Sequence, residues 1–228
     1  MKIIPVINCH FGDDECVLEK IKKAQEISDW VHLDVADGVF TFNKTWSNPS
    51  KWKNFNPNLN LEVHLMTENP EDQMENWILA GAKRIIFHWE AIRKHPSIHL
   101  ERNPQNSILK ILDLAKKYNV EMVMAVCVET SLEEIKPFLE KFNYFQILAV
   151  LPGPSGQKFL WPALDKIKEL KQLKPNAIIE VDGGINPEVV KKIKSAGAEI
   201  AVSGSYIFHN PNKNFKEAFN ELLQAVGD

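Results

Sequence analysis

Apolar residues at every second position from 30 to 36 predict a β-strand, because successive side chains of a strand point to opposite faces. His32 and Asp34 therefore share one face, about 7 Å apart along the strand. Taken alone, such a pair favours an ordinary hydrogen bond over a special site. Alternating or short apolar runs predict further strands at 3–8, 59–66, 84–87, 121–126, 144–150, 178–181 and 200–202.

Between the strands the apolar positions recur at helical spacing. Segment 40–58 is rich in Asn, Trp, Lys and Pro and is expected to be irregular. Segment 91–106 is expected to be a long loop that is either functional or loosely ordered. Start and stop signals predict helices at 15–28, 73–80, 107–118, 132–141, 161–173, 188–196 and 214–225, with a short one at 206–208.

Eight strands thus alternate with eight helix-like connections, which predicts a parallel sheet with right-handed crossovers. An open doubly wound sheet usually carries its glycine-rich phosphate turn after the first strand, where this chain has only Gly12. Glycine-rich turns instead follow the last three strands, as in barrels that bind phosphate. We therefore expect an α/β fold: one (β/α)8 TIM barrel, with residues 1–228 as a single domain.

Composition adds limits on partners and location. The formal net charge of −3 provides no basic field for nucleic acid. No stretch is long enough to span a membrane, and the N-terminal apolar run is too short for a signal peptide. The three cysteines, Cys9, Cys16 and Cys127, suggest no disulfide framework and no paired-ligand spacing. We expect a cytoplasmic protein in a reducing compartment that binds neither nucleic acid nor membrane.

In a barrel, the residues at the carboxyl ends of the strands converge on one mouth. His32 and Asp34 come from the second strand, His64 from the third and Asp182 from the seventh. Two imidazoles and two carboxylates make a site suited to one divalent ion, Zn²⁺, Fe²⁺, Mn²⁺ or Co²⁺. Further polar candidates follow the first and fourth strands: His10 as a spare ligand, and His88 and Glu90 as groups that orient a ligand or form an ordinary polar pair at the rim.

Three turns, at 152–157, 182–184 and 203–205, favour a phosphate site. Glycine lets the backbone approach an anion and point its N–H groups at it. The last turn also precedes the short helix at 206–208, whose N-terminus would favour phosphate.

Six motifs, in this order, resemble the ribulose-phosphate 3-epimerase family over nearly the whole chain: residues 32–38, 63–66, 87–91, 152–159, 181–185 and 204–205. The resemblance implies that His32, Asp34, His64 and Asp182 are the metal ligands and that Asp34 and Asp182 are the catalytic acid and base. It implies a substrate-binding set of Asn8, Met66, Gly153, Ser155, Gly156, Gly183, Gly184, Gly204 and Ser205. The loop at 153–156 resembles the family's substrate lid. The resemblance also implies that the TIM barrel is of the ribulose-phosphate-binding type.

The chain departs from the family pattern around the sugar. The family's usual methionines are replaced by Ala36 and Leu148, and its two first-strand serines by Pro5 and Asn8. A lid glycine and the preceding phenylalanine are replaced by Ser155 and Pro154, and the usual Asn-Pro-x-Thr-Pro motif reads as residues 127–131.

We therefore expect a metal-dependent 3-epimerase that converts D-ribulose 5-phosphate to D-xylulose 5-phosphate by two-carboxylate proton transfer through a metal-stabilised enediolate. One alternative is a 3-epimerase of another phosphosugar such as allulose 6-phosphate, for which Ala36 would make room. A lyase or decarboxylase of similar fold would carry Asp-x-Lys-x-x-Asp, which is absent from residues 32–37. A further alternative is a barrel that binds a phosphate ligand without catalysis. We also expect a homo-oligomer.

Overall fold

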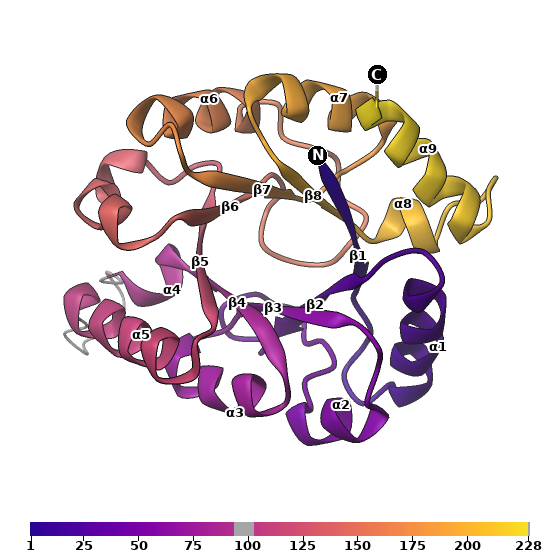
Figure 1. Cartoon of the computed structure of the whole chain (residues 1–228), viewed down its shortest axis with the longest axis horizontal. Helices are drawn as coiled ribbons and strands as arrows, with labels where there is room; N and C mark the ends of the chain where they lie inside the picture. The colour runs from indigo at the N-terminus through magenta and orange to yellow at the C-terminus, as the bar shows by residue number, and fades with distance from the viewer. Residues whose placement is uncertain (94–102, 228) are drawn as a thin grey trace.

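The computed structural model describes residues 1–93 and 103–227 and forms a closed barrel of eight parallel strands in sequence order (Figure 1). The first and last strands pair with each other and close it. The predicted fold class is confirmed, and every predicted strand is present. The strands are β1 (Lys2–Ile7), β2 (Trp30–Ala36), β3 (Asn60–Met66), β4 (Ala82–His88), β5 (Glu121–Cys127), β6 (Tyr144–Leu148), β7 (Ile178–Asp182) and β8 (Ile200–Ser203).

Helices form a ring around the barrel (Figure 1). Side-chain caps begin several of them: Asp13 accepts from the N–H of Cys16, and Asn186 accepts from the N–H groups of residues 188 and 189. The α-helices are α1 (Asp14–Gln25), α2 (Pro49–Phe55), α3 (Met74–Leu79), α4 (Trp89–Ile92), α5 (Pro104–Tyr118), α6 (Ala163–Leu173), α7 (Pro187–Ala196), α8 (Ser205–Phe208) and α9 (Phe215–Gly227), and the 3₁₀ helices are η1 (Pro70–Asp72), η2 (Leu132–Glu134) and η3 (Lys136–Lys141).

Three local expectations were wrong. Segment 40–58 contains α2, which Asn48 caps and Pro49 begins. The predicted helix at 132–141 is two 3₁₀ helices, because Pro137 has no N–H to continue an α-helical ladder from the first of them. Within the segment expected to be a loop, 91–106, residues 91–92 belong to α4 and residues 104–106 belong to α5. The part of this prediction that concerns positions 94–102 lies outside the described residues.

The apolar residues pack in two layers. The larger layer lies between the barrel and its helices and includes Leu33, Val63 and Val181. The smaller layer includes Ile4, Val123 and Val202, with side chains from alternate strand positions that fill the barrel itself. Much of the remaining space inside the barrel is occupied by buried polar side chains, His32, Glu62, Arg84, Gln146 and Glu180 among them.

The cysteine prediction was also wrong: Cys9 and Cys16 form a disulfide, and Cys127 is free. The turn at 10–13 reverses the chain, so Cys9, two residues after β1, meets Cys16 in the first turn of α1. Among the described residues, no helix is both long enough and apolar enough to cross a membrane.

Candidate active site

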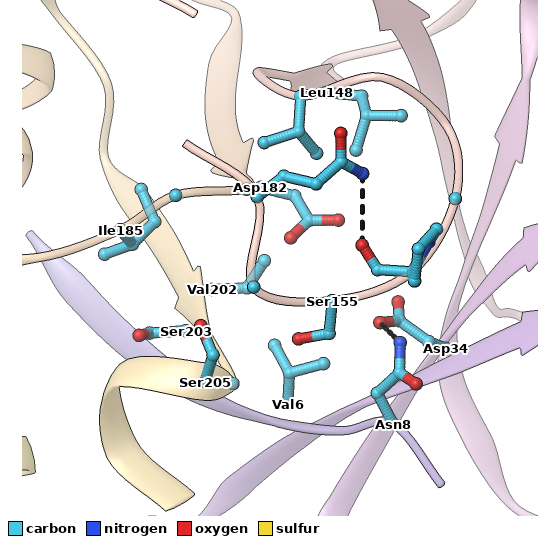
Figure 2. Close-up of a pocket in the computed structure, with 18 of the residues that line it drawn as sticks. Val6, Asn8, Asp34, Leu148, Ser155, Asp182, Ile185, Val202, Ser203 and Ser205 are labelled. Atoms are coloured by element: carbon cyan, nitrogen blue, oxygen red, sulfur yellow. Dashed lines mark hydrogen bonds between the residues drawn. The ribbon is translucent and has the colours of Figure 1, made fainter. Parts of the chain in front are cut away.

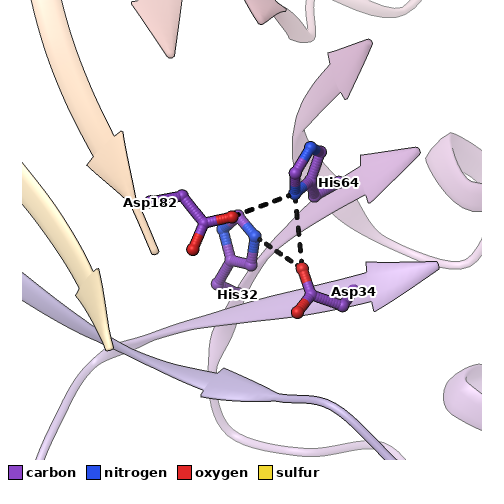
Figure 3. A group of neighbouring side chains, drawn as sticks. All are labelled: His32, Asp34, His64 and Asp182. Carbon is purple, nitrogen blue, oxygen red and sulfur yellow. Dashed lines mark hydrogen bonds and ion pairs between the residues drawn. The ribbon is translucent and has the colours of Figure 1, made fainter. Parts of the chain in front are cut away.

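Strand register brings the four predicted metal ligands together. β2 and β3 are neighbours, and Asp34 lies opposite His64 in their register. Asp182 ends β7, which β1 and β8 separate from β2. His64 Nδ1 lies 3.3 Å from Asp34 Oδ1 and 3.4 Å from Asp182 Oδ2, and His32 Nε2 lies 3.2 Å from Asp34 Oδ1 (Figure 3). One nitrogen or oxygen from each residue lies within 4.8 Å of the others.

Burial and hydrogen bonding set the charges of this group. Burial alone would raise the pKa of Asp34, but hydrogen bonds to His32 and His64 outweigh it and hold this pKa well below its usual range. Burial would likewise lower the pKa of both histidines. Carboxylate partners reverse this effect, so the pKa of His32 lies well above its ordinary value and that of His64 is also raised. A cation at this position would take the place of these protons.

The donor set fits a divalent metal ion. Two imidazole nitrogens and two carboxylate oxygens suit zinc, iron, manganese or cobalt better than calcium or magnesium, which prefer oxygen alone. Each donor comes from a barrel strand rather than from a long loop. The arrangement can therefore hold an ion in a fixed position at the mouth of the barrel.

A cavity lies beside these residues, and Figure 2 shows Asp34 and Asp182 facing it from different strands. The three glycine-rich turns all border it. They contribute Gly153, Ser155, Gly156, Gly183, Gly184, Gly204 and Ser205, while Met66 and Leu148 come from strands and Asn8 directly follows β1. Every residue of the predicted substrate-binding set thus lines one cavity. The hydroxyl of Ser203 lines it too, and within the described part of the chain this buried group has no hydrogen-bond partner.

Two glycines of the turn after β7 are required by close packing. A side chain at Gly183 would meet Val150 at 2.6 Å, and one at Gly184 would meet the backbone nitrogen of Phe159 at 2.3 Å. Both glycines also have positive φ angles. The turn therefore packs directly against both ends of the loop at 150–159, which covers the cavity.

Asn8 orients one of the two carboxylates. Its side-chain amide donates to Asp34 Oδ2 over 2.8 Å, and its backbone carbonyl accepts from the buried ammonium of Lys20 over 2.8 Å. The Cys9–Cys16 disulfide fixes the next residue to α1. Asp34 Oδ2 is therefore held from the β1 side, while Oδ1 faces the histidines.

The remaining histidine candidates differ in placement. His88 Nε2 lies 2.8 Å from His64 Nε2, and His88 Nδ1 lies 3.1 Å from Glu90 Oε2. Burial lowers the pKa of His88, although Glu90 partly opposes this effect. These two residues therefore adjoin the ligand group, as one of the two sequence interpretations expected. His10 is exposed, pairs with Thr45 in an isolated bridge and is not part of the ligand group.

Sequence reasoning missed a second layer of polar residues inside the barrel. Glu62 Oε1 lies 2.8 Å from His32 Nδ1, and Arg84 pairs with the other oxygen of Glu62. Tyr144 and Gln146 donate to Glu180 over 2.8 and 3.0 Å. Period two carried the missing signal, since Glu62 stands two residues before His64 and Glu180 two residues before Asp182.

Known proteins resemble this chain over most of its length. A sequence model described as the ribulose-phosphate 3 epimerase family matches residues 6–208. The chain is 33% identical over 215 residues to the ribulose-phosphate 3-epimerase of Chlamydia muridarum, covering 90% of this chain and 88% of the relative. It is 32% identical over 219 residues to that of Helicobacter pylori, covering 93% of each.

Solved structures with the same fold are more distant in sequence. A crystal structure of 3-hexulose-6-phosphate synthase superposes with a TM-score of 0.70 at 17% identity, over 99% of each chain. Orotidine 5'-phosphate decarboxylase from Pyrococcus horikoshii superposes with a TM-score of 0.66 at 13% identity, again over 99% of each. At these identities the likeness concerns the barrel alone.

Proposed function

Because the chain belongs to the ribulose-phosphate 3-epimerase family, we propose that it interconverts D-ribulose 5-phosphate and D-xylulose 5-phosphate with the help of one divalent metal ion. It is an epimerase, an isomerase that acts on carbohydrates. The observation that carries the finer proposal is the convergence of Asp34 and Asp182 on His64 Nδ1 beside a cavity that glycine-rich turns enclose.

Epimerisation next to a ketone needs one group to remove a proton and another to return a proton to the opposite face. Asp34 and Asp182 project from strands that are not neighbours and lie at the same end of the barrel. We assign one as the base and the other as the acid, with the roles exchanged in the reverse reaction. The low pKa of Asp34 keeps this carboxylate ionised at neutral pH.

His32, Asp34, His64 and Asp182 would hold the metal ion, which is zinc, iron, manganese or cobalt in this proposal. When bound, the ion would stabilise the negative charge that develops on the sugar oxygens as C3 loses its proton. The loop over the cavity would exclude water during this step, and Gln157 fixes its shape by donating to the carbonyls of Leu151 and Pro154.

The phosphate of the substrate would bind at the turns after β6, β7 and β8. The backbone lies close to the cavity at three positions that have no side chain, Gly183, Gly184 and Gly204. Their N–H groups can donate hydrogen bonds to an anion. The unpaired hydroxyl of Ser203 is a further donor there. Met66 and Leu148 would form the apolar wall beside the sugar.

A larger substrate such as allulose 6-phosphate remains the alternative that the replacement at Ala36 suggests. Ala36 is buried and pairs in register with Met66, which lines the cavity, although Ala36 itself is not among the lining residues. Cytoplasmic location and self-association stay predictions. A relative from rice is named as a cytoplasmic isoform.

The test is proton exchange at C3. We expect the enzyme loaded with Mn²⁺, Zn²⁺, Fe²⁺ or Co²⁺ to convert D-ribulose 5-phosphate in D₂O and to exchange the C3 hydrogen, both measured by proton NMR. Asp34→Asn and Asp182→Asn should each abolish epimerisation, because inversion at C3 needs a proton carrier on each face. Asp37→Asn is the matched control, because Asp37 accepts backbone N–H groups of residues 39, 40 and 68 and does not line the cavity.

Epimerisation that persists in either active-site variant would refute the assignment of Asp34 and Asp182. A loaded wild-type enzyme that binds the sugar phosphate but exchanges no hydrogen would favour the non-catalytic barrel. A parallel assay with allulose 6-phosphate compares kcat/KM for the two sugars. A higher value for the hexulose would replace the pentulose as substrate.

A further inference from the structure

We infer that Glu62 and the His88–Glu90 pair are positioning residues. They determine which imidazole nitrogen of the two histidine ligands, His32 and His64, carries the proton. The inference rests on the metal site proposed above and extends it to residues that touch neither the ion nor the sugar. Each histidine ligand has one nitrogen among the carboxylates and the other against a buried partner.

The first arm is the chain of side-chain contacts that runs from His32 through Glu62 to Arg84. His32 Nδ1 lies 2.8 Å from Glu62 Oε1, and both side chains have no exposed surface. A carboxylate accepts hydrogen bonds and donates none, so Nδ1 carries the proton. His32 Nε2, which lies 3.2 Å from Asp34 Oδ1, is then the nitrogen left for a metal ion.

Arg84 holds the Glu62 end of this arm. Its guanidinium pairs with the second oxygen of Glu62 and also donates to Glu121 over 2.8 Å. It lies 4.2 Å from the centre of the Tyr144 ring, which limits its movement. The carboxylate that meets His32 is therefore fixed by a cation from the neighbouring strand β4.

The second arm runs from His64 through His88 to Glu90. His64 Nδ1 faces Asp34 and Asp182, so the lone pair that binds a metal ion must be on Nδ1 and the proton on Nε2. This Nε2 lies 2.8 Å from His88 Nε2, and one hydrogen serves both rings. His88 must then accept at Nε2 and carry its own proton on Nδ1, which lies 3.1 Å from Glu90 Oε2.

Glu90 is held as firmly as Glu62. Its other oxygen accepts from the backbone N–H of Cys127 over 2.9 Å and from the hydroxyl of Thr130. The direction of every hydrogen bond in the arm is thus fixed, from His64 outward to Glu90. Partners of this kind raise the basicity of a histidine ligand and set its ring orientation, and removing one typically weakens metal binding about 10- to 100-fold.

The first experiment measures Zn²⁺ affinity by competition with a chromophoric chelator, with circular dichroism to check that each variant is folded. We expect Glu62→Gln and Glu90→Gln to bind Zn²⁺ about 10- to 100-fold more weakly than the wild type. Glu134→Gln is the matched control. Glu134 accepts from Trp89 and Arg93, so its hydrogen bonds involve no histidine.

The second experiment needs no variant and covers the case in which Glu62→Gln fails to fold. Two-bond ¹H–¹⁵N NMR spectra of the Zn²⁺-loaded wild type report the protonated nitrogen of each imidazole. We expect the proton on Nδ1 of His32, on Nε2 of His64 and on Nδ1 of His88. A different nitrogen on any ring, wild-type affinity in both glutamine variants or a wild type that binds no Zn²⁺ would overturn the inference. A wild type that shows these tautomers but no epimerase activity would refute only the proposed function.

Discussion

Replacing Gly184 by alanine tests whether the turn after β7 and the loop over the cavity are packed as one unit. Gly184 has a φ angle of +67°, and a Cβ atom there would lie 2.3 Å from the nitrogen and 2.6 Å from the Cα of Phe159. Gly156, in the same loop, has a φ angle of +92° but no atom within 4 Å of its Cβ position. Comparing Gly184→Ala with Gly156→Ala therefore separates two losses of stability, one from the backbone conformation and one from steric overlap.

The magnitude follows from these two terms. A non-glycine residue in a left-handed conformation loses about 1 to 2 kcal/mol, and both alanine variants incur this loss. In Gly184→Ala the contact with Phe159 must also open from 2.3 Å to at least 3.0 Å, and the atom that must move is backbone rather than a flexible side chain. Overpacking of this kind typically adds about 1 to 3 kcal/mol. We expect Gly184→Ala to lose about 2 to 5 kcal/mol of unfolding free energy and Gly156→Ala about 1 to 2 kcal/mol.

Urea denaturation followed by fluorescence measures the unfolding free energies of both variants under the same conditions. The m-value should stay the same in both variants, so that a shift in midpoint reports stability alone. If Gly184→Ala is no less stable than Gly156→Ala, then the loop moves away from the turn at little cost. The close packing of residues 184 and 159 would then not hold the two segments together.

Two further predictions concern stability. Burial would raise the pKa of Glu90, but hydrogen bonds from His88, Thr130 and Cys127 outweigh it and lower this pKa to about 2, so the stabilisation is present above about pH 4.5 and disappears as the pH falls towards 2. Urea unfolding at several pH values should show that Glu90→Gln lacks this part of the acid sensitivity, about 3 kcal/mol, and an unchanged pH profile would contradict the assignment. The Cys9–Cys16 disulfide closes a short loop with a sequence separation of 7, so Cys16→Ser should lower the unfolding free energy by about 2 to 3 kcal/mol in oxidising buffer. Dithiothreitol should lower the stability of the wild type by a similar amount and leave the variant unchanged, and equal stability of both proteins before reduction would show that the bond contributes nothing.

The barrel was predictable because its signals are local. A period of two indicates the strands, and helical spacing indicates most of the connections between them. The glycine-rich turns after the last three strands favour a barrel over an open sheet. His32, Asp34, His64 and Asp182 could be grouped from sequence because parallel strands place their carboxyl ends at one mouth. The position of each ligand at a strand end is enough to group the four, without knowledge of any contact between residues far apart in sequence.

The sequence did not predict the disulfide, the role of Glu62 or helix α2. The first two depend on tertiary structure, and the third has a composition that is unusual for a helix. The Cys9–Cys16 pair needs the turn at 10–13 to bring β1 and α1 together, and no spacing rule contains that turn. Glu62 shares a face with His64 but lies in the interior of β3, whereas the site residues of a barrel are expected at the carboxyl ends of its strands. α2 has ordinary start signals at Asn48 and Pro49, but the polar and aromatic composition around them concealed its period.

The polar interior also bears on how the barrel reaches its folded state. Glu62 and Arg84 come from the first four strands, whereas Tyr144 and Glu180 come from the last four. Arg84 nonetheless lies against the ring of Tyr144, and His32 Nδ1 lies 3.7 Å from Glu180, so each half supplies partners for buried groups of the other. A half-barrel would leave some of these groups without partners in a low-dielectric interior, at a cost of several kcal/mol each. The two halves should therefore fold cooperatively and should not be exchangeable with halves of other barrels unless the interior charges are redesigned as well.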